Sequence, residues 1–289
     1  MKFLGTGAAE MYPNPFCGCT VCERARAEGE APRLRSALLL DRHNLIDFGP
    51  DVLAASLLYH APLTELENVF ITHTHEDHFS LANIDVLTMT DKRTDHWPVR
   101  FYLSARACDW LARYIRAVGP LYAGGRTDLE RLMDAGRVTF QPVRPYEPFK
   151  GGGMRIFPVE SNHRVNDGEY ALNYLFDRGP DGKLLYVADA GLYDTHNLEA
   201  LRGAGADRLV MEGTFGSQEL DEASPHLNAA HFITQVERFV QAGIIRPDAA
   251  IYVTHINQCN TFTQTEYQAY MGSHTRRRIM VAYDGMEIA

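Results

Sequence analysis

No stretch of this chain approaches the roughly 18 consecutive apolar residues that a membrane-spanning helix needs. The first residues, Met1–Gly7, lead into an expected strand and a glycine turn and show no signal-peptide pattern. No internal repeat or low-complexity tract is present either. We therefore expect a soluble, cytoplasmic protein that has no membrane partner.

Basic residues are also scarce. The 289 residues include 28 Lys and Arg against 37 Asp and Glu, which gives a formal net charge of −9 at pH 7. This balance argues against a nonspecific nucleic-acid surface, and with it against a tRNA-processing or other nuclease. A cleft that holds metal cations would still attract a small anionic substrate, which is the partner we expect.

Two common enzyme motifs are missing. There is no G-x-x-x-x-G-K-[ST], so the glycines of 151–153 do not form a phosphate cradle, and we expect 144–153 to be a loop. There is no H-E-x-x-H either, because His75 and His78 are i,i+3 and not i,i+4. A metalloprotease of the zincin type is therefore excluded.

The most informative motif that is present is H-x-H-x-D-H, which begins two residues after Ile71. An extended strand sends His73 and His75 to the same side, while Asp77 and His78, one turn later, reach a neighbouring position. Three imidazoles and a carboxylate in so short a segment indicate a metal site. One loop can therefore supply ligands to two metal ions.

This motif resembles the signature loop of the metallo-β-lactamase superfamily of metallohydrolases. The resemblance implies further ligands at the ends of later strands, for which the candidates are His163, Asp189 and His255. It also implies how the ligands divide between two ions. One ion is held by His73, His75 and His163, the other by Asp77, His78 and His255, and Asp189 bridges them. Asp47 is expected to orient a ligand or the loop.

The resemblance implies an α/β fold, the four-layer αβ/βα sandwich, in which two sheets pack face to face and helices cover both outer sides. With 45% hydrophobic residues the chain can bury such a core, and candidate ligands spread from 73 to 255 favour a single domain over 1–289. Strands are expected at 36–40, 44–48, 68–72, 99–103, 137–141, 154–159, 184–188, 208–211 and 249–254. Helices are expected at 104–118, 128–135, 228–242 and 264–271, with Gly243 and Gly272 as stops.

Three of the five cysteines are crowded into C-x-C-x2-C at Cys17, Cys19 and Cys22. Such crowding suggests a zinc-binding loop near 17–22 that holds a structural zinc. Three thiolates leave a tetrahedral ion one ligand short, and Cys259 is the first candidate for the fourth, followed by His226. A disulfide among these cysteines and unligated thiols are the alternatives.

Several motifs together are similar to the phosphoribosyl cyclic-phosphate phosphodiesterases of phosphonate breakdown. They are Leu4–Ala9, the cysteine loop, Thr254–Ile256 and Tyr283–Ile288. In that subgroup a His three positions beyond the late metal His completes the structural zinc site. This chain has Gln258 at that position, and glutamine is a poor zinc ligand. Cys259 is therefore the expected replacement.

The resemblance implies a binuclear hydrolase of a small phosphodiester, a cyclic ribose phosphate included, that acts through a hydroxide bridging the metals. Asp77, as a metal ligand, and His226, as the acid that protonates the departing oxygen, are the expected catalytic residues. The alternative for His226 is a side chain that only packs at a helix start beside Asn228, with His231 as the exposed histidine of that helix. Arg164 is either a phosphate contact or a surface arginine.

Other functions share these motifs. The cysteine loop and Thr254–Asn257 also resemble the cofactor-biosynthesis branch related to the pyrroloquinoline quinone proteins, which could use iron and oxygen. A lactonase or other ester hydrolase is a further alternative, because the same hydroxide can attack a carbonyl carbon. The active-site ligand types accept Zn, Mn, Fe or Ni. The superfamily resemblance also suggests a homodimer.

Overall fold

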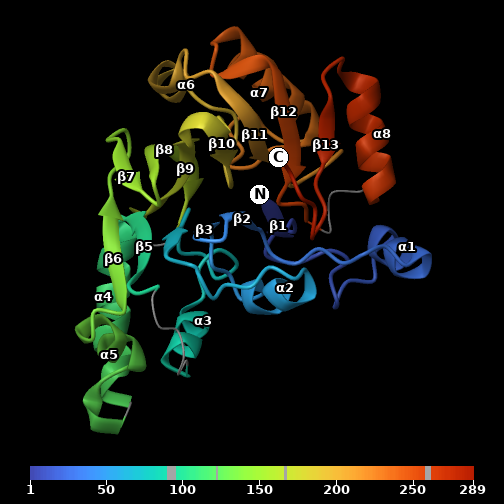
Figure 1. The fold of residues 1–289 in the computed structure, drawn as a ribbon. Helices are drawn as coiled ribbons and strands as arrows, with labels where there is room; N and C mark the ends of the chain where they lie inside the picture. Colours follow the sequence, from blue (N-terminus) through green and yellow to red (C-terminus); the bar gives the residue numbers. More distant parts are fainter. Residues whose placement is uncertain (90–95, 122, 166–167, 258–261) are drawn as a thin grey trace.

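The computed structural model describes residues 1–89, 96–121, 123–165, 168–257 and 262–289. Within these ranges the strands form two sheets, which pack against each other and carry helices on their outer sides (Figure 1). This arrangement is the four-layer αβ/βα sandwich, so the predicted fold class is confirmed. None of the helices in the described ranges has the length and apolarity to span a bilayer.

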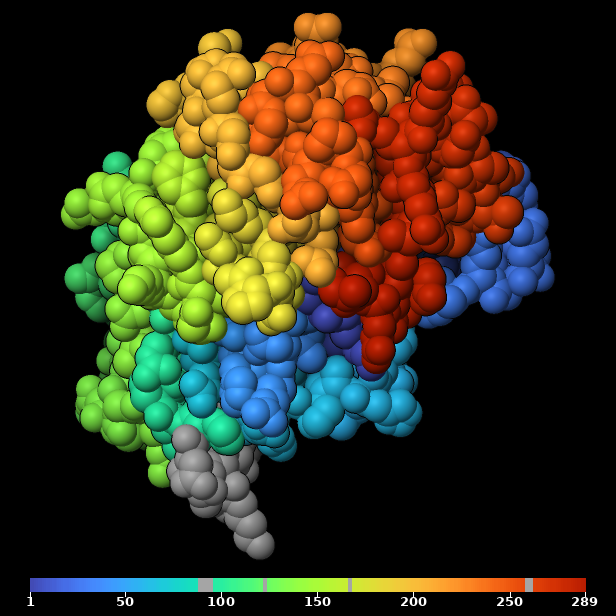
Figure 2. Space-filling view, turned by 45° about the horizontal axis from the view of Figure 1, so that its top comes forward, coloured from blue at the N-terminus to red at the C-terminus, as the bar shows by residue number. Residues whose placement is uncertain are grey.

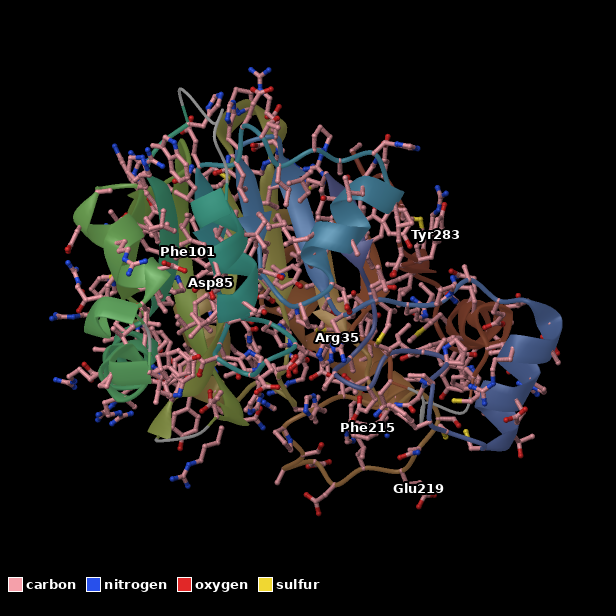
Figure 3. The ribbon with its side chains drawn as sticks, turned by 90° about the horizontal axis from the view of Figure 1, so that it is seen from below. Arg35, Asp85, Phe101, Phe215, Glu219 and Tyr283 are labelled. Atoms are coloured by element: carbon pink, nitrogen blue, oxygen red, sulfur yellow. The ribbon has the colours of Figure 1, made fainter. Side chains whose placement is uncertain are left out.

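The first sheet comes from the N-terminal half of the chain. Its strands lie side by side in sequence order: β1 (Lys2–Gly5), β2 (Ala37–Asp41), β3 (Asn44–Ile46), β4 (Asn68–Phe70), β5 (Val99–Ser104) and β6 (Val138–Val143). The first three pair antiparallel, and β3 to β6 pair parallel. The helices that cover its outer face, seen in Figure 3, are α2 (Val52–Leu58), α3 (Leu81–Asp85), α4 (Ala105–Val118) and α5 (Asp128–Asp134).

The second sheet follows in the order β13 (Ile279–Val281), β12 (Ile245–Thr254), β11 (Ala206–Glu212), β10 (Lys183–Val187), β9 (Tyr170–Asp177), β8 (Met154–Arg164) and β7 (Phe149–Gly151). The pairs β10–β11, β11–β12 and β12–β13 are parallel, and the pairs β7–β8, β8–β9 and β9–β10 are antiparallel. Its outer helices are α6 (Thr195–Leu201), α7 (Ala229–Gln241) and α8 (Gln264–His274). Helix α1 (Thr20–Glu28) contains Cys22, the last of the three clustered cysteines, and Arg24 of α1 pairs with Glu266 of α8 at 2.6 Å.

The core between the two sheets is rich in aromatic rings. Phe70 of β4 stacks on Tyr102 at 5.0 Å between ring centroids and meets Phe176 of the second sheet edge-on at 5.2 Å. All three are buried, and rings in these arrangements stabilise a core beyond the area that they bury. This packing fixes the distance between the sheets, and therefore between the loops that leave them.

The two ends of the described chain meet at the edge of the first sheet. The N–H of Phe3 donates to the carbonyl of Met286 at 3.0 Å, and the N–H of Ile288 donates to the carbonyl of Met1 at 2.9 Å. In Figure 2 the dark blue start of the chain lies beside its red end. The open edge of β1 is therefore covered by the last residues of the sequence.

Two expectations about secondary structure are wrong. The segment 144–153, expected to be a loop, contains β7, which pairs with β8 so that Gly151 lies opposite Met154. The two residues between them, Gly152 and Gly153, both have positive φ (55° and 76°), as a tight hairpin of this kind requires. Helix α8 also continues past Gly272 to His274, because glycine inside a helix weakens it without breaking it.

Six chain segments converge at one edge of the sandwich. Asp47 follows β3, and the loop with the histidine motif follows β4. On the second sheet β8, β10, β11 and β12 run in the same direction, since β9 is antiparallel to both of its neighbours. Their carboxyl ends carry His163, Asp189, Glu212 and His255. Carboxyl ends of strands in α/β folds are where ligands bind.

Candidate metal centre

The loop after β4 owes its shape to Asp47. This carboxylate is fully buried and accepts hydrogen bonds from the Thr72 N–H at 2.8 Å and from the Thr72 hydroxyl at 2.9 Å. Further along, the His78 N–H donates to the carbonyl of His75 at 3.0 Å, which turns the chain back on itself. The turn places the second half of the motif beside the first.

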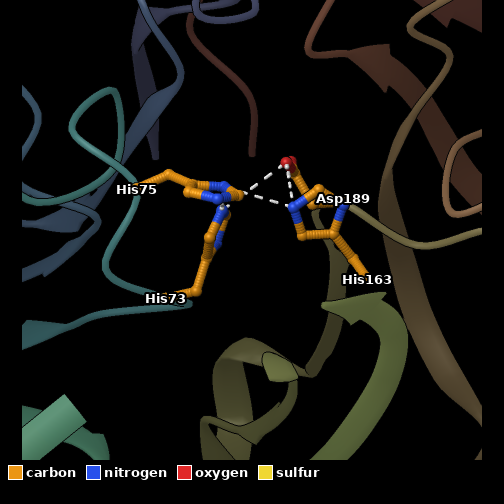
Figure 4. A group of neighbouring side chains, drawn as sticks. All are labelled: His73, His75, His163 and Asp189. Carbon is orange, nitrogen blue, oxygen red and sulfur yellow. Dashed lines mark hydrogen bonds and ion pairs between the residues drawn. The ribbon is translucent and has the colours of Figure 1, made fainter. Parts of the chain in front are cut away.

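One ligand group is formed by His73, His75, His163 and Asp189 (Figure 4). The His75 Nδ1 lies 2.9 Å from the His73 Nε2 and 3.2 Å from the His163 Nε2. The Asp189 Oδ2 lies 3.6 Å from the first of these Nε2 atoms and 3.7 Å from the second. Four ligand atoms therefore surround one point.

The second ligand group is formed by Asp77, His78 and His255, again with Asp189. The His78 Nε2 lies 3.1 Å from the Asp77 Oδ2 and 3.2 Å from the His255 Nε2. The other Asp189 oxygen, Oδ1, lies 3.1 Å from the His255 Nε2 and 3.5 Å from the His78 Nε2. Each oxygen of Asp189 thus faces its own set of imidazoles.

Both groups fit a divalent cation. Ligand atoms at 2.0–2.1 Å from a tetrahedral ion lie about 3.3 Å from one another, and the spacings of 2.9–3.7 Å within these groups scatter around that value. The Asp189 Oδ1 is buried and accepts no hydrogen bond from the described residues. A buried carboxylate oxygen in this position is costly unless a cation or a proton pairs with it.

Supporting contacts select the nitrogen that each imidazole presents. The His78 Nδ1 donates to Asp47 at 2.7 Å, and the His255 Nδ1 donates to the Thr214 hydroxyl at 2.9 Å, which leaves both Nε2 atoms as ligands. The Thr72 hydroxyl lies 3.1 Å from the His73 Nδ1 and has the same effect there. Contacts of this kind fix ring orientation and raise ligand basicity.

The protonation states suit metal binding in the first ligand group. Burial lowers the pKa of His163 to about 4 and that of His73 well below its usual value, so both rings are neutral at pH 7. Burial raises the pKa of Asp189, but the surrounding histidines, His255 foremost, hold it below its usual range. Neutral imidazole and ionised carboxylate are the forms that coordinate metals. In the second group, burial lowers the pKa of His78 and of His255, but Asp77 and Asp189 raise both above their usual value, so these rings must release a proton when an ion binds.

His226 lies against both ligand groups without completing either tetrahedron. Its ligand atoms come within 4.8 Å of those of Asp189 and His255, and its ring lies 4.8 Å from that of His163. The His226 Nδ1 donates to Glu212 at 2.8 Å. Burial lowers the pKa of His226, but the Glu212 carboxylate reverses this and raises it to about 9. A metal ion bound beside His226 would lower that pKa. We therefore base the role of His226 on its position beside Asp189 and His255.

A family model described as a β-lactamase superfamily domain matches residues 42–256, which include all seven candidate ligands of the two groups. The chain belongs to the metallo-β-lactamase superfamily. Family and site together support a metal-dependent hydrolase. No curated protein matches the chain by sequence.

Solved structures of this superfamily cover the whole chain. The Zn²⁺-bound PqqB of Methylobacterium extorquens aligns with a TM-score of 0.72 and 18% identity over 99% of this chain and 98% of its own. A diphosphatase of the PhnP family aligns with a TM-score of 0.69 and 18% identity, over 100% of this chain and 96% of its own. The short form of human tRNase Z aligns at 0.60 and 17% over 100% and 98%. At these identities the likeness shows the shared fold alone.

One buried residue of the site, Glu212, is not predicted from the sequence. Glu212, at the end of β11, is fully buried and accepts hydrogen bonds from the Ala190 N–H at 2.8 Å, the Leu227 N–H at 3.1 Å and the Thr214 hydroxyl at 2.5 Å, besides His226. The sequence signal that could have indicated Glu212 is an acidic residue at the end of an apolar strand. Its contacts join the loops that carry Asp189, His226 and His255.

Residues at this edge adopt unusual backbone conformations. Asp47, Asp189 and His255 have φ values of 62°, 40° and 57°, in the left-handed region that costs a residue with a side chain. All three are held by the contacts described above or by the ligand groups. Backbone strain concentrated in this way is typical of functional sites.

Asn162 fastens two of these loops together. Its side-chain oxygen accepts the Gly191 N–H at 2.8 Å, and its amide donates to the carbonyl of Ser224 at 3.1 Å. A Cβ on Gly191 would lie 1.8 Å from that carbonyl oxygen. Residue 191 must therefore be glycine for the loop of Asp189 to approach the loop of His226.

Gly191→Ala is expected to lower the free energy of unfolding by about 1–3 kcal/mol, because the loops must separate to admit the methyl group. Urea denaturation of the metal-free protein measures this. Gly272→Ala is the control, since no atom lies within 4 Å of its added Cβ and helix α8 should gain about 0.5–1 kcal/mol. Equal stability of the two variants would contradict the close approach.

The cysteine loop forms a separate cluster. The sulfurs of Cys17, Cys19 and Cys22 lie within 4.8 Å of one another, and sulfur atoms gather beside α1 in Figure 3. These cysteines are free thiols, so the alternative of a disulfide among them does not hold. Cys259, together with Gln258, lies outside the described residues.

His226, the second candidate for the fourth zinc ligand, does not join the cysteine cluster. It lies with Asp189 and His255, because the contact with Glu212 holds its ring at the other site. Among the described residues no further Cys, His, Asp or Glu ligand atom joins the three thiols. Arg164, the candidate phosphate contact, ends β8 with an exposed side chain.

Proposed function

We propose that the chain is a binuclear hydrolase that acts on small phosphodiesters. The observation that carries this proposal is the position of Asp189, whose two oxygens face two different sets of imidazoles. A carboxylate between two cations offsets their mutual repulsion. His73, His75 and His163 would hold one ion, Asp77, His78 and His255 the other, and Asp189 both.

Divalent ions at these positions, Mn or Zn by ligand type and also Fe or Ni, would lower the pKa of bound water and offset charge that builds on phosphate oxygens. The protein supplies the proton for the leaving group. The His226 Nδ1 donates to Glu212, so its Nε2 is the nitrogen available to the departing oxygen. Phe215 packs edge-on against the His226 ring at 5.7 Å and limits its rotation. His226 held by Glu212 therefore has the arrangement of a positioned general acid.

Phosphorus substrates are favoured by two similarities. One aligned structure is described as a diphosphatase of the PhnP family, and the motifs at both ends of the chain are similar to cyclic-phosphate phosphodiesterases. A cyclic ribose phosphodiester is therefore the first substrate to test. The net charge of −9 favours a small anion over a polyanion. A second copy of the chain is the other partner that we propose.

A cofactor-biosynthesis role of the pyrroloquinoline quinone type is the second candidate. It is favoured by the alignment with PqqB over 99% of this chain and by the shared cysteine loop. Hydrolysis of a lactone or another ester is the third, because water activated at the same ligands can attack a carbonyl carbon. The three differ in the substrate consumed.

The function is tested by offering a cyclic phosphodiester, a phosphomonoester and a lactone to protein reconstituted with Mn²⁺ or Zn²⁺. We expect turnover of the diester in preference to the other two. Turnover of the lactone alone would assign carbonyl chemistry. No turnover of any of them, with both ions bound, would refute the hydrolase proposal in favour of metal-dependent oxidation.

We also propose that the cysteine loop holds one structural zinc ion within a single domain that spans 1–289. Cys19 directly precedes α1 and Cys22 lies in its first turn, so the start of the helix holds two of the three sulfurs close together. Cys259 is the proposed fourth ligand. The superfamily fold does not need this ion for catalysis, so its loss should affect stability more than turnover.

Cys22→Ser is expected to remove one zinc equivalent per chain and to lower the thermal midpoint, because three thiolates become two. Zinc content by atomic spectroscopy and a melting curve measure this. Cys108→Ser is the matched control, since Cys108 lies on α4 apart from the cluster. Unchanged zinc content in Cys22→Ser would contradict the zinc loop, and Cys259→Ser tests the fourth ligand in the same way.

A further inference from the structure

A further group of ligating side chains lies at the other edge of the first sheet. It consists of His43, Glu67 and His96, whose ligand atoms lie within 4.8 Å of one another. These residues precede β3, β4 and β5, which are parallel neighbours. The starts of these strands therefore meet at one edge, while the candidate metal centre lies at the ends of the strands.

The two sites are well separated. From Glu67 the chain runs through β4 to His73, and six residues of extended chain span about 20 Å. The ligands of one site therefore cannot reach an ion in the other. We call the group of His43, Glu67 and His96 the strand-start site. An ion bound there is expected to leave the chemistry at the strand ends unchanged.

The backbone of two of these three residues, His43 and Glu67, is fixed by hydrogen bonds at the starts of the strands. The carbonyl of His43 accepts hydrogen bonds from the N–H groups of Glu67 at 3.0 Å and Asn68 at 2.9 Å, and the carbonyl of Glu67 accepts the Arg100 N–H at 2.8 Å. Sites built on strands hold their ligands more precisely than sites on free loops. Little conformational entropy is then lost on binding.

The side chains are spaced as ligands of one ion. The Glu67 Oε1 lies 3.0 Å from the His96 Nδ1 and 3.9 Å from the His43 Nδ1. These values bracket the separation of about 3.3 Å between ligands of a tetrahedral ion. The three side chains are 33%, 34% and 29% exposed, which lets an ion enter from solvent. Next to them lies a surface cavity of about 390 Å³, lined also by Asn44, Asn68, Arg100 and Tyr102, which has room for water ligands. The Arg100 guanidinium is a neighbouring positive charge, against which the Glu67 carboxylate must hold the ion.

Hydrogen bonds compete for the same atoms. The His43 Nδ1 donates to the carbonyl of Glu65 at 2.9 Å, and its Nε2 accepts from Arg42 at 3.0 Å. The Arg42 side chain is 71% exposed and already pairs with Glu65 at 3.3 Å. It can therefore leave the imidazole without burying an unpaired charge. The ring can then carry its proton on Nε2 and present Nδ1, the nitrogen 3.9 Å from Glu67, as a neutral ligand in exchange for its hydrogen bond to the Glu65 carbonyl.

We propose that His43, Glu67 and His96 form a further divalent-metal site, suited to Zn²⁺ with water as the remaining ligand. Two imidazoles and one carboxylate are a common zinc donor set. The bound ion joins the turn before β3 to the starts of β4 and β5. It stabilises the edge of the sheet that lies away from the metal centre, and it takes no part in the proposed hydrolysis.

The test is the zinc content of the full-length protein after equilibration in a zinc buffer, for wild type and for the double variant His43→Gln/His96→Gln. We expect the double variant to lose one equivalent per chain and to keep its diester turnover. His274→Gln is the control, because that histidine stacks on Tyr270 of α8 outside every ligand group found among the described residues. Equal zinc content in wild type and the double variant would overturn the proposal.

Glu67→Gln is a second test, in case the double variant fails to fold. The glutamine oxygen can still accept the hydrogen bond from His96, so the melting curve of the zinc-free protein should be unchanged while one zinc equivalent is lost. Retention of that equivalent would also overturn the proposal. Asp189→Ala, in contrast, should lose the ions of the metal centre and keep this one, so failure of the proposed hydrolase and failure of this site give different results.

Discussion

Asp189→Ala should release both ions of the metal centre and lower turnover of the diester by more than about 100-fold. Loss of an outer partner that only orients a ligand already costs up to about that factor, and Asp189 faces both ligand groups directly. Metal content by atomic spectroscopy and kcat/KM on the cyclic diester measure the two effects. The cysteine zinc should remain bound.

Asp181→Asn is the matched control, because it removes one carboxylate from an exposed turn and should change neither quantity. If Asp189→Ala released a single ion and the protein kept half its activity, the bridging role would be wrong. Asp189 would then be a ligand of one ion only.

His226→Ala should lower kcat by about 100- to 10,000-fold on a diester whose leaving group is an alkoxide, since such a group departs only with a proton. With a 4-nitrophenolate leaving group the loss should be about 10-fold or less, because that anion departs unprotonated. Metal content should stay at the wild-type value. Kinetics on the two substrates, with metal analysis of the same samples, measure this.

His231→Ala, in the first turn of α7 that follows the loop of His226, is the control and should behave as wild type. Equal losses on both leaving groups would show that His226 does not act as an acid. A loss of metal would make it a ligand, in keeping with its distance from Asp189 and His255. Glu212→Gln should show the leaving-group dependence in weaker form, because it leaves His226 present but poorly oriented.

The part of the candidate site that the sequence alone can predict is the part that is local in the chain. In H-x-H-x-D-H the ligands are fixed by one strand end and one turn, so residue spacing alone indicates metal binding. His163, Asp189 and His255 came from family resemblance, because each lies on a different strand and no local pattern joins them. The structure brings all of them together.

Glu212 escaped prediction for a physical reason. An acidic residue at the end of a strand usually faces solvent, and only the packing of three loops around this one buries it.

Helix α1 was not predicted although the shorter α5 was. Helix α5 buries Leu129 and Leu132 at helical spacing, whereas the residues that α1 buries are the small Cys22 and Ala25, so α1 lacks an apolar face that a sequence pattern could show. The glycines of 151–153 predict a loop, but Gly152 and Gly153 form the tight turn of a hairpin, and so β7 precedes them.

The pairing of β1 with the last residues of the chain sets a delay in biosynthesis. Phe3 leaves the ribosome more than 280 residues ahead of Met286, its hydrogen-bond partner. At 5–20 residues per second this interval is about 15–60 s, during which one edge of the first sheet has no neighbour of its own. An unpaired strand edge invites association with other nascent chains. The new polypeptide is therefore most prone to aggregate, and most in need of a chaperone, before residues 286–288 emerge.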